Sequence, residues 1–588
     1  MRTPTLQYLY LQKPITLMLV ICLFSVIPWI GLGDFSTKGE PREANVAVSM
    51  IESGNWSLPD AYANEFSYKP PLYHWMVSVF SLPIGHVTEF TARLPSALAF
   101  ILLCAFSLLF FGRRTKFHLA FVSVLLCVTC FELHRAAITA RVDMLLTFFI
   151  VSGLYSLYEW ENSLELKGLP PLIPILLGCA ILTKGPVGVI LPLFVFFVYL
   201  LLLQKYSLLK IVKSVFFIGF SSLFLPSLWY ISAYQRGGSD FLAVTLAENF
   251  GRFLHINIPN INYELGHRAP FYYNFLTLLW GSLPWTLLAV FALFGFNFNK
   301  TKETFKNFPH NLLIRLKKMD KVKLFSLVAI VCIVLFYCIP SSKRSVYLMP
   351  VYPFLFIFLA EFLLFITENR TRVTRVFSSI MSFIGLFILI LFFGISFRLF
   401  DPLSLLEAHL PGENAMAQAI GGLTYMLRPD GITWGVVLLI IFSLGVVLYQ
   451  IFRNVNIKML YATIGLTLFL NMFVDGVVMR GTRKMTSPRA FVSSVQVHHP
   501  EVLKHSVYVM NDLLKYRNLY GLRFYWNQPF KNFETASPAE GYMFVAEKDL
   551  PLIESVYKDY TFTKIDVSSY LIGSVRQRII LTQFKKIA

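Results

Sequence analysis

Long apolar runs alternate with short polar stretches along almost the whole chain of 588 residues. A helix needs about 20 mostly apolar residues to cross the hydrocarbon core of a bilayer, and about thirteen runs approach that length. They lie near residues 15–33, 93–112, 118–134, 142–158, 171–183, 187–203, 214–234, 271–297, 324–340, 348–366, 376–397, 431–452 and 459–478. The pattern predicts an α-helical polytopic membrane protein with about 13 transmembrane helices. The first run lacks a small-residue cleavage site, so we expect an anchor and not a removable signal peptide.

A long polar loop, residues 34–92, separates the first two apolar runs. Within it, residues 40–53 and 72–82 have the spacing of amphipathic helices, which would lie along the membrane surface. The first of these helices is expected to stop at Gly54. Long ordered loops of this kind usually carry function.

The last 109 positions, 480–588, form a second polar region after the final apolar run. Residues 506–510, 542–546 and 578–582 have strand-like patterns, and a helix is expected over 550–560 with Pro551 in its first turn. We therefore expect a transmembrane domain over residues 1–479 and a small exterior α/β domain over residues 480–588.

Composition and charge support this topology. Of all residues, 56% are hydrophobic and only 14% are charged, whereas soluble proteins are about a quarter charged. The excess of 52 Lys and Arg over 33 Asp and Glu gives a net charge of +19. Basic residues gather in alternate loops, among them Arg113-Arg114-Thr115-Lys116 and the stretch 300–323. The positive-inside rule places these loops and the N-terminus in the cytoplasm, and the C-terminal domain outside.

The basic net charge is explained by these loops, and no other feature of the sequence indicates binding of nucleic acid. The seven cysteines all lie in apolar runs, so the sequence contains no visible disulfide framework. Cys127 and Cys130 form a Cys-x-x-Cys spacing inside one apolar run, which we interpret as small residues of a membrane helix.

Ionisable residues are concentrated in short motifs at the exterior ends of the predicted spans. The motifs are Gly39-Glu40-Pro41-Arg42-Glu43-Ala44, Tyr68-Lys69-Pro70-Pro71, Phe90-Thr91-Ala92-Arg93, Arg141-Val142-Asp143, Leu182-Thr183-Lys184-Gly185, Glu248-Asn249-Phe250-Gly251-Arg252, His267-Arg268-Ala269-Pro270 and Ser342-Lys343-Arg344-Ser345-Val346-Tyr347. Charged groups at membrane depth are costly and tend to be functional. Carboxylates and several bases on one face are what a reaction with a phosphate leaving group requires.

These motifs, in this order over residues 10–360, resemble the bacterial aminoarabinose lipid A transferases and, more distantly, the protein O-mannosyltransferases. Both are multi-span glycosyltransferases of the GT-C class that use sugars carried on a polyprenyl phosphate. The resemblance implies a GT-C fold, transfer with inversion from an undecaprenyl-phosphate type donor, and an exterior C-terminal domain. It also implies location in a bacterial inner membrane, with the active site facing the periplasm.

The resemblance and the required chemistry together suggest roles for individual residues. Glu40 is expected to act as general base, assisted by Asp143. Lys69, Arg268 and Lys343 are expected to bind the leaving phosphate, and Tyr347 to close the site. Arg93 and Lys184 are further candidates for substrate binding.

The chain departs from the family pattern in two places. Gly39 stands where the family usually has Asp, and Tyr68 stands where it often has Glu. No cofactor is implied with certainty. A divalent metal stays possible, although no cluster of ligands in the sequence supports one, and we predict no metal-binding residue.

Several functions stay open from the sequence. The acceptor is lipid A, another glycolipid, a polysaccharide or a protein, and the sugar is not determined. A protein O-glycosyltransferase of the same class is one alternative, and a polytopic lipid or glycan transporter is another, although no internal repeat supports the latter. A scaffold whose exterior domain binds a partner would explain the C-terminal region but not the first loop.

Overall fold

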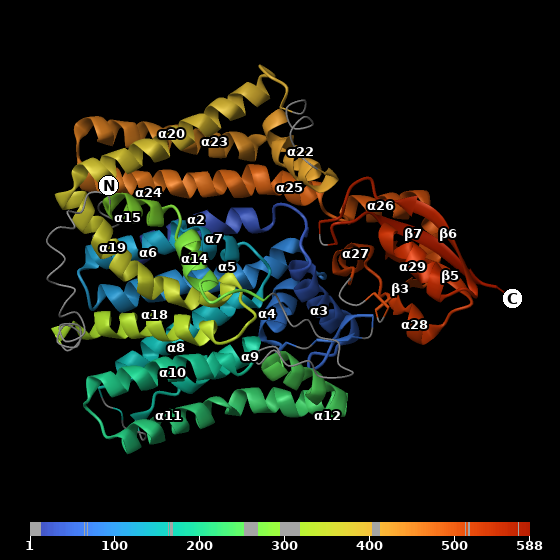
Figure 1. Ribbon diagram of the computed structural model, residues 1–588, viewed down its shortest axis with the longest axis horizontal. Coiled ribbons are helices and arrows are strands. Elements are labelled where there is room, and N and C mark those ends of the chain that lie inside the picture. The colour runs from blue at the N-terminus through green and yellow to red at the C-terminus, as the bar shows by residue number, and fades with distance from the viewer. Residues whose placement is uncertain are drawn as a thin grey trace.

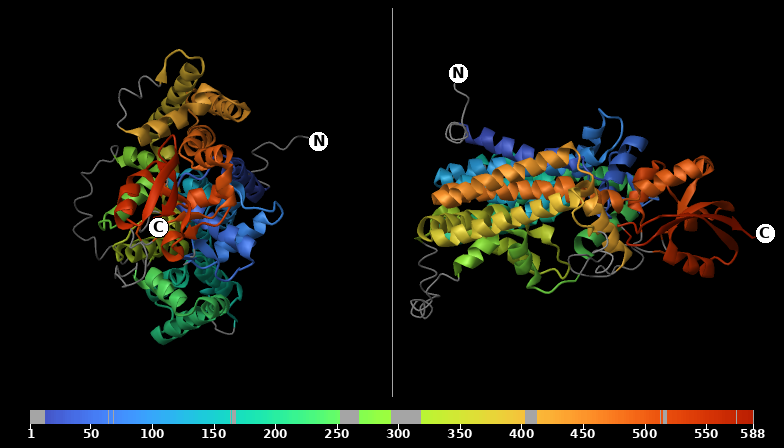
Figure 2. Two further views of the ribbon diagram at one scale, coloured as in Figure 1. Left: turned by 90° about the vertical axis from the view of Figure 1, so that its right-hand side faces the viewer. Right: turned by 90° about the horizontal axis from the view of Figure 1, so that it is seen from above.

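The fold is described from a computed structural model, which covers residues 13–587 except 64, 68, 163, 165–167, 252–267, 294–317, 403–411, 512, 515–517 and 574. Long helices run side by side in an elongated bundle, and a smaller unit containing a β-sheet lies at one end of it (Figures 1 and 2). This is the expected fold class, a helical membrane protein with a small C-terminal α/β unit.

Each apolar run predicted from the sequence contains at least one helix. The bundle helices are α2 (Pro14–Ile30), α5 (Glu89–Gly112), α6 (Phe117–Thr129), α7 (Phe131–Ala137), α8 (Val142–Trp160), α9 (Leu172–Lys184), α10 (Val187–Leu203), α11 (Leu208–Ser222), α12 (Phe224–Leu246), α14 (Tyr273–Gly281), α15 (Trp285–Leu293), α18 (Lys321–Cys338), α19 (Tyr352–Asn369), α20 (Thr371–Ser396), α22 (Glu413–Leu427), α23 (Gly431–Arg453) and α24 (Asn456–Phe473). Among the described residues, seven helices are long and apolar enough to cross a membrane, or ten if each bent pair is one span. The multi-pass character is thus confirmed, and the count of thirteen stays a prediction.

Three predicted spans are not straight helices. The axes of α6 and α7 meet at 64°, those of α11 and α12 at 44°, and those of α14 and α15 at 101°. Pro284 lies in the break between α14 and α15, where a proline cannot donate the backbone hydrogen bond that continues a helix. Cys130 adopts an extended conformation between α6 and α7. Hydropathy predicted the apolar runs and not these bends.

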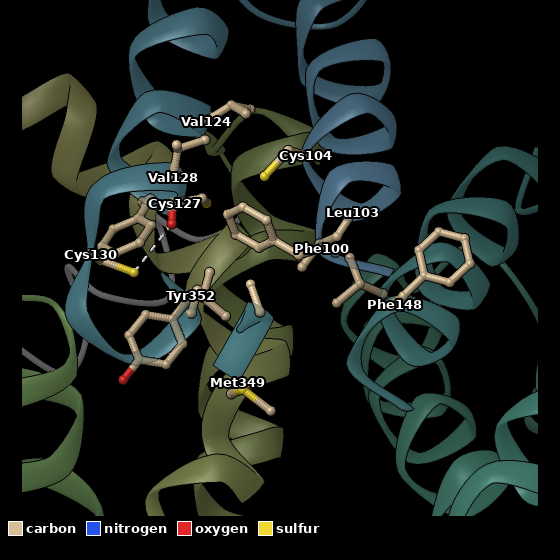
Figure 3. Close-up of a cluster of buried hydrophobic side chains, with 14 of the residues drawn as sticks. Phe100, Leu103, Cys104, Val124, Cys127, Val128, Cys130, Phe148, Met349 and Tyr352 are labelled. Carbon is tan, nitrogen blue, oxygen red and sulfur yellow. Dashed lines mark hydrogen bonds between the residues drawn. The ribbon is translucent and has the colours of Figure 1, made fainter. Parts of the chain in front are cut away.

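Apolar and aromatic side chains fill the centre of the bundle. Phe100 and Cys104 of α5, Cys127 of α6 and Tyr352 of α19 meet there (Figure 3). The thiol of Cys130 donates to the backbone carbonyl of Cys127 at 3.4 Å, and all seven cysteines are free thiols. The Cys-x-x-Cys spacing therefore belongs to the packed core.

Both helices predicted in the first loop are present. α3 (Gly39–Ser53) ends at Gly54 in the left-handed conformation, with φ of 67°, which glycine adopts without the steric cost of a Cβ. α4 (Leu72–Ser81) starts directly after Pro71. Between them lies a short hairpin, β1 (Asp60–Tyr62) and β2 (Glu65–Phe66), that the sequence did not predict.

A continuous helix leads from the bundle into the C-terminal unit. α24 continues through a π-helical segment, Val474–Met479, into α25 (Arg480–Met485), so the boundary expected between residues 479 and 480 lies inside a helix. A mixed sheet follows, in the strand order β4-β3-β5-β7-β6. Its strands are β3 (Val507–Val509), β4 (Lys531–Asn532), β5 (Glu540–Ala546), β6 (Tyr560–Val567) and β7 (Ile579–Lys586).

The three strands predicted for this unit are confirmed as β3, β5 and β7, and β5 pairs with β7 in antiparallel register with Met543 opposite Thr582. The predicted helix over residues 550–560 is shorter, because α29 (Leu550–Val556) ends before Tyr560 begins β6. Three further helices complete the unit: α26 (Arg489–His498), α27 (Tyr520–Trp526) and α28 (Phe533–Ala536).

The C-terminal unit contacts the first loop of the bundle through polar bonds. The amide of Asn45 on α3 donates to the backbone carbonyl of Tyr520 at 2.9 Å. Arg489 on α26 forms an ion pair with Glu89 at 2.5 Å, and the Tyr525 hydroxyl donates to the same carboxylate at 2.8 Å. The C-terminal unit and the first loop therefore form one end of the molecule (Figure 2).

A close crossing of α22 and α25 gives a test of this fold. The backbones meet at Gly421 and Gly481, and a Cβ at position 481 would overlap the carbonyl oxygen of Gly421. We expect Gly481→Ala to destabilise the protein by about 1–3 kcal/mol through overpacking. The measurement is thermal unfolding of the purified protein in detergent. Gly465→Ala is the control, because a Cβ there meets open space, and equal melting of the two variants would contradict the crossing.

Candidate active site

Charged side chains from α3, α8, α9 and the segment before α4 gather at the end of the bundle nearest the C-terminal unit. The Lys69 ammonium donates to Glu43, and the Lys184 ammonium donates to Asp143. Lys69 also lies within electrostatic reach of Asp143. We call Glu43, Lys69, Asp143 and Lys184 the charge cluster, in which acidic and basic groups alternate.

Local sequence explains the position of Lys69. It precedes Pro70 and Pro71, and a residue before proline is restricted to extended backbone. α4 then starts immediately at Leu72. Lys69 is therefore held at a fixed point between the first-loop hairpin and α4.

Glu43 is almost completely enclosed, with 3% of its side chain exposed. Its carboxylate accepts hydrogen bonds from Lys69, from Arg42 Nη2 at 3.1 Å and from His74 Nε2 at 2.9 Å. Burial alone would raise its pKa, but these cations and the His74 hydrogen bond hold the pKa of Glu43 well below its usual range. The carboxylate is thus ionised at neutral pH.

Glu43 is not among the site residues predicted from the sequence, although it stands in the same motif as Glu40. The available signal was spacing, because residues 39 and 43 are four apart and share one face of a helix.

Asp143 lies in the first turn of α8, where the helix dipole favours a carboxylate. Lys184 is the last residue of α9, the end at which a cation is favoured. The Lys184 ammonium also lies 4.3 Å from the ring centroid of Tyr347. That ring stacks on Tyr337 with a centroid distance of 5.4 Å. Tyr347 therefore borders the charge cluster, in which the Asp143 and Lys184 side chains meet.

The Leu182-Thr183-Lys184-Gly185 and Glu248-Asn249 motifs also meet. Gly185 has φ of +85°, and a Cβ there would overlap the side-chain oxygen of Asn249. The tight turn after Lys184 therefore requires glycine for two reasons, its backbone conformation and the close approach of Asn249.

Arg268 and Lys343 lie on two segments that are joined to each other. Arg268 forms an antiparallel bridge with Ser342. The Lys343 ammonium donates to the carbonyl oxygens of Ala269 at 3.1 Å and Pro340 at 2.7 Å. These bonds hold the segment that leads into Tyr347, while Arg268 is exposed. Tyr68 and His267 lie outside the described residues.

Glu40 and Arg93 form a separate buried pair. Arg93 has no exposed surface, and its Nε donates to Glu40 Oε1 at 2.8 Å. The same carboxylate oxygen accepts the backbone N–H of Ala140 at 3.1 Å. Burial would raise the pKa of Glu40, but Arg93 and Arg483 overcome this effect and lower the pKa. Glu40 therefore fixes the start of α8, three residues before Asp143, from a fully enclosed position.

Within the described part of the chain, no group of three or more His, Cys, Asp or Glu residues is arranged to hold a metal ion. His74 and His134 each pair with a single carboxylate, Glu43 and Asp475 respectively. Binding of a divalent metal is therefore neither supported nor excluded by the described residues.

Comparisons with known proteins agree with this architecture. The family model for dolichyl-phosphate-mannose-protein mannosyltransferases matches residues 50–236. An uncharacterised protein of Aquifex aeolicus is 30% identical over 60% of this chain and 64% of its own length. The undecaprenyl phosphate-α-4-amino-4-deoxy-L-arabinose arabinosyl transferase of Shewanella sediminis is 23% identical over 65% of this chain and 67% of its own length. The match thus spans about two thirds of these relatives.

The crystal structure of ArnT from Cupriavidus metallidurans bound to undecaprenyl phosphate superposes with a TM-score of 0.67 and 16% identity, covering 97% of each chain. Its apo form gives a TM-score of 0.66. The fold is therefore that of ArnT. In sequence, the chain is similar to the arabinosyl transferases and, over residues 50–236, to the protein mannosyltransferase family model.

The Arg93–Glu40 pair provides a test of the site's framework. We expect Arg93→Met to destabilise the protein by about 3–5 kcal/mol, because it leaves a buried carboxylate without its counter-ion. Thermal unfolding and the yield of folded protein measure the effect. Lys564→Met is the control: its ion pair with Glu547 is exposed, and its loss should cost about 1 kcal/mol at most. Similar stability of the two variants would refute the framework role.

Proposed function

We propose that the protein is an integral-membrane glycosyltransferase that transfers a sugar from an undecaprenyl-phosphate type donor to an acceptor on the periplasmic side. The observation that carries this proposal is the charge cluster, which places a carboxylate between two lysines at one end of a bundle with the ArnT fold. The names of the functionally described relatives favour a transferase over a transporter.

Asp143 is the general base in this proposal. The acceptor oxygen or nitrogen attacks the anomeric carbon and gives its proton to Asp143, while the bond from that carbon to the phosphate oxygen breaks. A single displacement inverts the anomeric centre. Exposure favours Asp143 over Glu40: 10% of the Asp143 side chain is exposed, against 2% for Glu40. Glu40 and Arg93 are then positioning residues that fix the start of α8.

Lys69 and Lys184 supply positive charge where the departing phosphate gains negative charge. Arg268 adds a cation from the exposed side, and Tyr347 covers the Lys184 side of the site. Lys343 contributes by holding the Arg268 and Tyr347 segments together. Residues 34–92 form the exterior loop of the membrane domain, and the C-terminal unit lies on the same periplasmic side.

The acceptor in this proposal is lipid A or a related glycolipid of the bacterial inner membrane, as the family resemblance implies. A protein acceptor is the second candidate, because the matched family model describes protein mannosyltransferases. With either acceptor, the donor is a lipid-linked sugar and membrane lipids surround the protein. The N-terminus lies in the cytoplasm in both cases.

Replacement of the base tests the reaction. We expect Asp143→Asn to lower the rate of transfer from purified polyprenyl-phosphate sugar by about 10²–10⁴-fold, which is the usual contribution of a positioned base. Glu52→Gln is the control, because Glu52 pairs with Arg523 of the C-terminal unit and is not a member of the charge cluster. Transfer by Asp143→Asn at the wild-type rate would exclude Asp143 as the base.

The acceptor is identified by mass spectrometry of the envelope. We expect deletion of the gene to remove a sugar-sized mass increment from lipid A, and complementation with Asp143→Asn to leave that increment absent. An increment lost from periplasmic proteins, with lipid A unchanged, would instead establish the protein-acceptor alternative.

A further inference from the structure

The three acidic residues of α3 each have a basic partner, but the partners differ in kind. Glu40 pairs with the buried Arg93, and Glu52 pairs with Arg523 of the C-terminal unit. Glu43 pairs with Lys69, which belongs to the charge cluster. Of the three, Glu43 is therefore the acid that acts directly on a residue proposed to meet the donor.

We propose that Glu43 is a positioning residue that keeps the Lys69 ammonium charged and directed at the phosphate of the lipid-linked donor. This inference rests on the proposed function, because it assumes that Lys69 binds that phosphate. It assigns to Glu43 a task that differs from that of the proposed base, Asp143.

Hydrogen bonds fix the Glu43 carboxylate from three directions. Oε1 accepts from Lys69 and Arg42, and Oε2 accepts from His74 at 2.9 Å. The side chain of Lys69 is 16% exposed, whereas that of Glu43 is 3% exposed. Lys69 is thus the more exposed member of the pair, and Glu43 acts through it.

The first turn of α3 explains why this task falls to residue 43. Gly39 offers no side chain, and the guanidinium of Arg141 fills the space that a Cβ there would need. Residue 43 follows one turn later on the same helix face, and a helical side chain leans toward the helix N-terminus. Glu43 therefore places a carboxylate back toward the turn in which position 39 has none.

Four charged or titratable groups act on Lys69. Arg42 on α3 opposes its charge, while Glu43 on α3 and Asp143 on α8 support it. His74 on α4 is held neutral by burial, which lowers its pKa, and so donates to Glu43 as a neutral ring. Burial and Arg42 lower the pKa of Lys69 to about 7 despite Glu43, so Lys69 changes its charge near neutral pH.

The sign of the effect follows directly. A negative Glu43 raises the pKa of Lys69, so its replacement by a neutral group lowers that pKa further. Lys69 then loses its proton at a lower pH, and with it the ability to pair with a phosphate. Removal of Glu43 should therefore weaken phosphate binding most at the alkaline end of the pH range.

The test is binding of a short-chain polyprenyl phosphate to the full-length protein in detergent, followed from pH 6 to pH 9. We expect the alkaline midpoint of binding to fall by roughly one pH unit in Glu43→Gln, which is about tenfold weaker binding above the wild-type midpoint. Glu43→Asp should keep a midpoint near that of the wild type, because it keeps the charge. Glu52→Gln, a neutralised acid on the same helix, should leave the profile unchanged.

A second pair of variants separates charge from structure. An arginine does not titrate in this range, so Lys69→Arg should bind without an alkaline limit, and adding Glu43→Gln to it should produce no pH shift. A merely structural Glu43 would weaken binding equally at every pH. Equal midpoints in the wild type and Glu43→Gln, or an alkaline limit retained in Lys69→Arg, would overturn the inference.

The proposed function fails in a different way. If the wild type binds no polyprenyl phosphate, or if Lys69→Met binds it as tightly as the wild type at every pH, the assumed role of Lys69 is wrong. The ionisation of the phosphate itself is common to all variants, so it cancels in each comparison. If Glu43→Gln does not fold, an alkaline limit retained in Lys69→Arg still overturns the inference.

Discussion

The buried guanidinium of Arg93 fixes the position of the chain between α2 and α3. Arg93 has no exposed surface, and a charge in such a place is tolerated only when its donors are satisfied and a counter-ion is present. Its Nη1 donates to the carbonyls of Ile30 and Gly33, both at 2.9 Å, and its Nε to Glu40. One side chain of α5 therefore fixes the end of α2 and the start of α3. Through Glu40 it also fixes the backbone at Ala140.

The geometry of the charge cluster follows from this constraint. Glu43 lies one turn after Glu40 on α3, and Asp143 lies three residues after Ala140. Both carboxylates are thus set by the same buried ion pair, although they come from distant parts of the sequence. The lysines complete the cluster from rigid points, Lys69 before two prolines and Lys184 at the end of α9. Precise placement of charge requires such rigid supports.

The sequence predicted the apolar helices well, because a bilayer allows few ways to satisfy buried backbone groups and demands long apolar runs. It also proposed Asp143, Lys69, Lys184 and Tyr347 as site residues, and the structure brings these four together. It did not predict which charges would pair, since Arg93 and Glu40 are 53 positions apart and local patterns contain no such information. Glu43 was overlooked for the same reason, as its partner Lys69 is 26 positions away.

The C-terminal unit is joined to the end of the bundle that carries the charge cluster. Asn45, on one face of α3, donates to the backbone carbonyl of Tyr520 on α27, a helix of the C-terminal unit. Glu40, on another face, is held by the bundle. α3 is thus held by Arg93 of the bundle and by α27 of the C-terminal unit. Because Glu43 projects from a helix held on two sides, its carboxylate contacts Lys69 in a fixed position. The C-terminal unit supplies no residue to the charge cluster, but it supports the cluster by holding α3 in place.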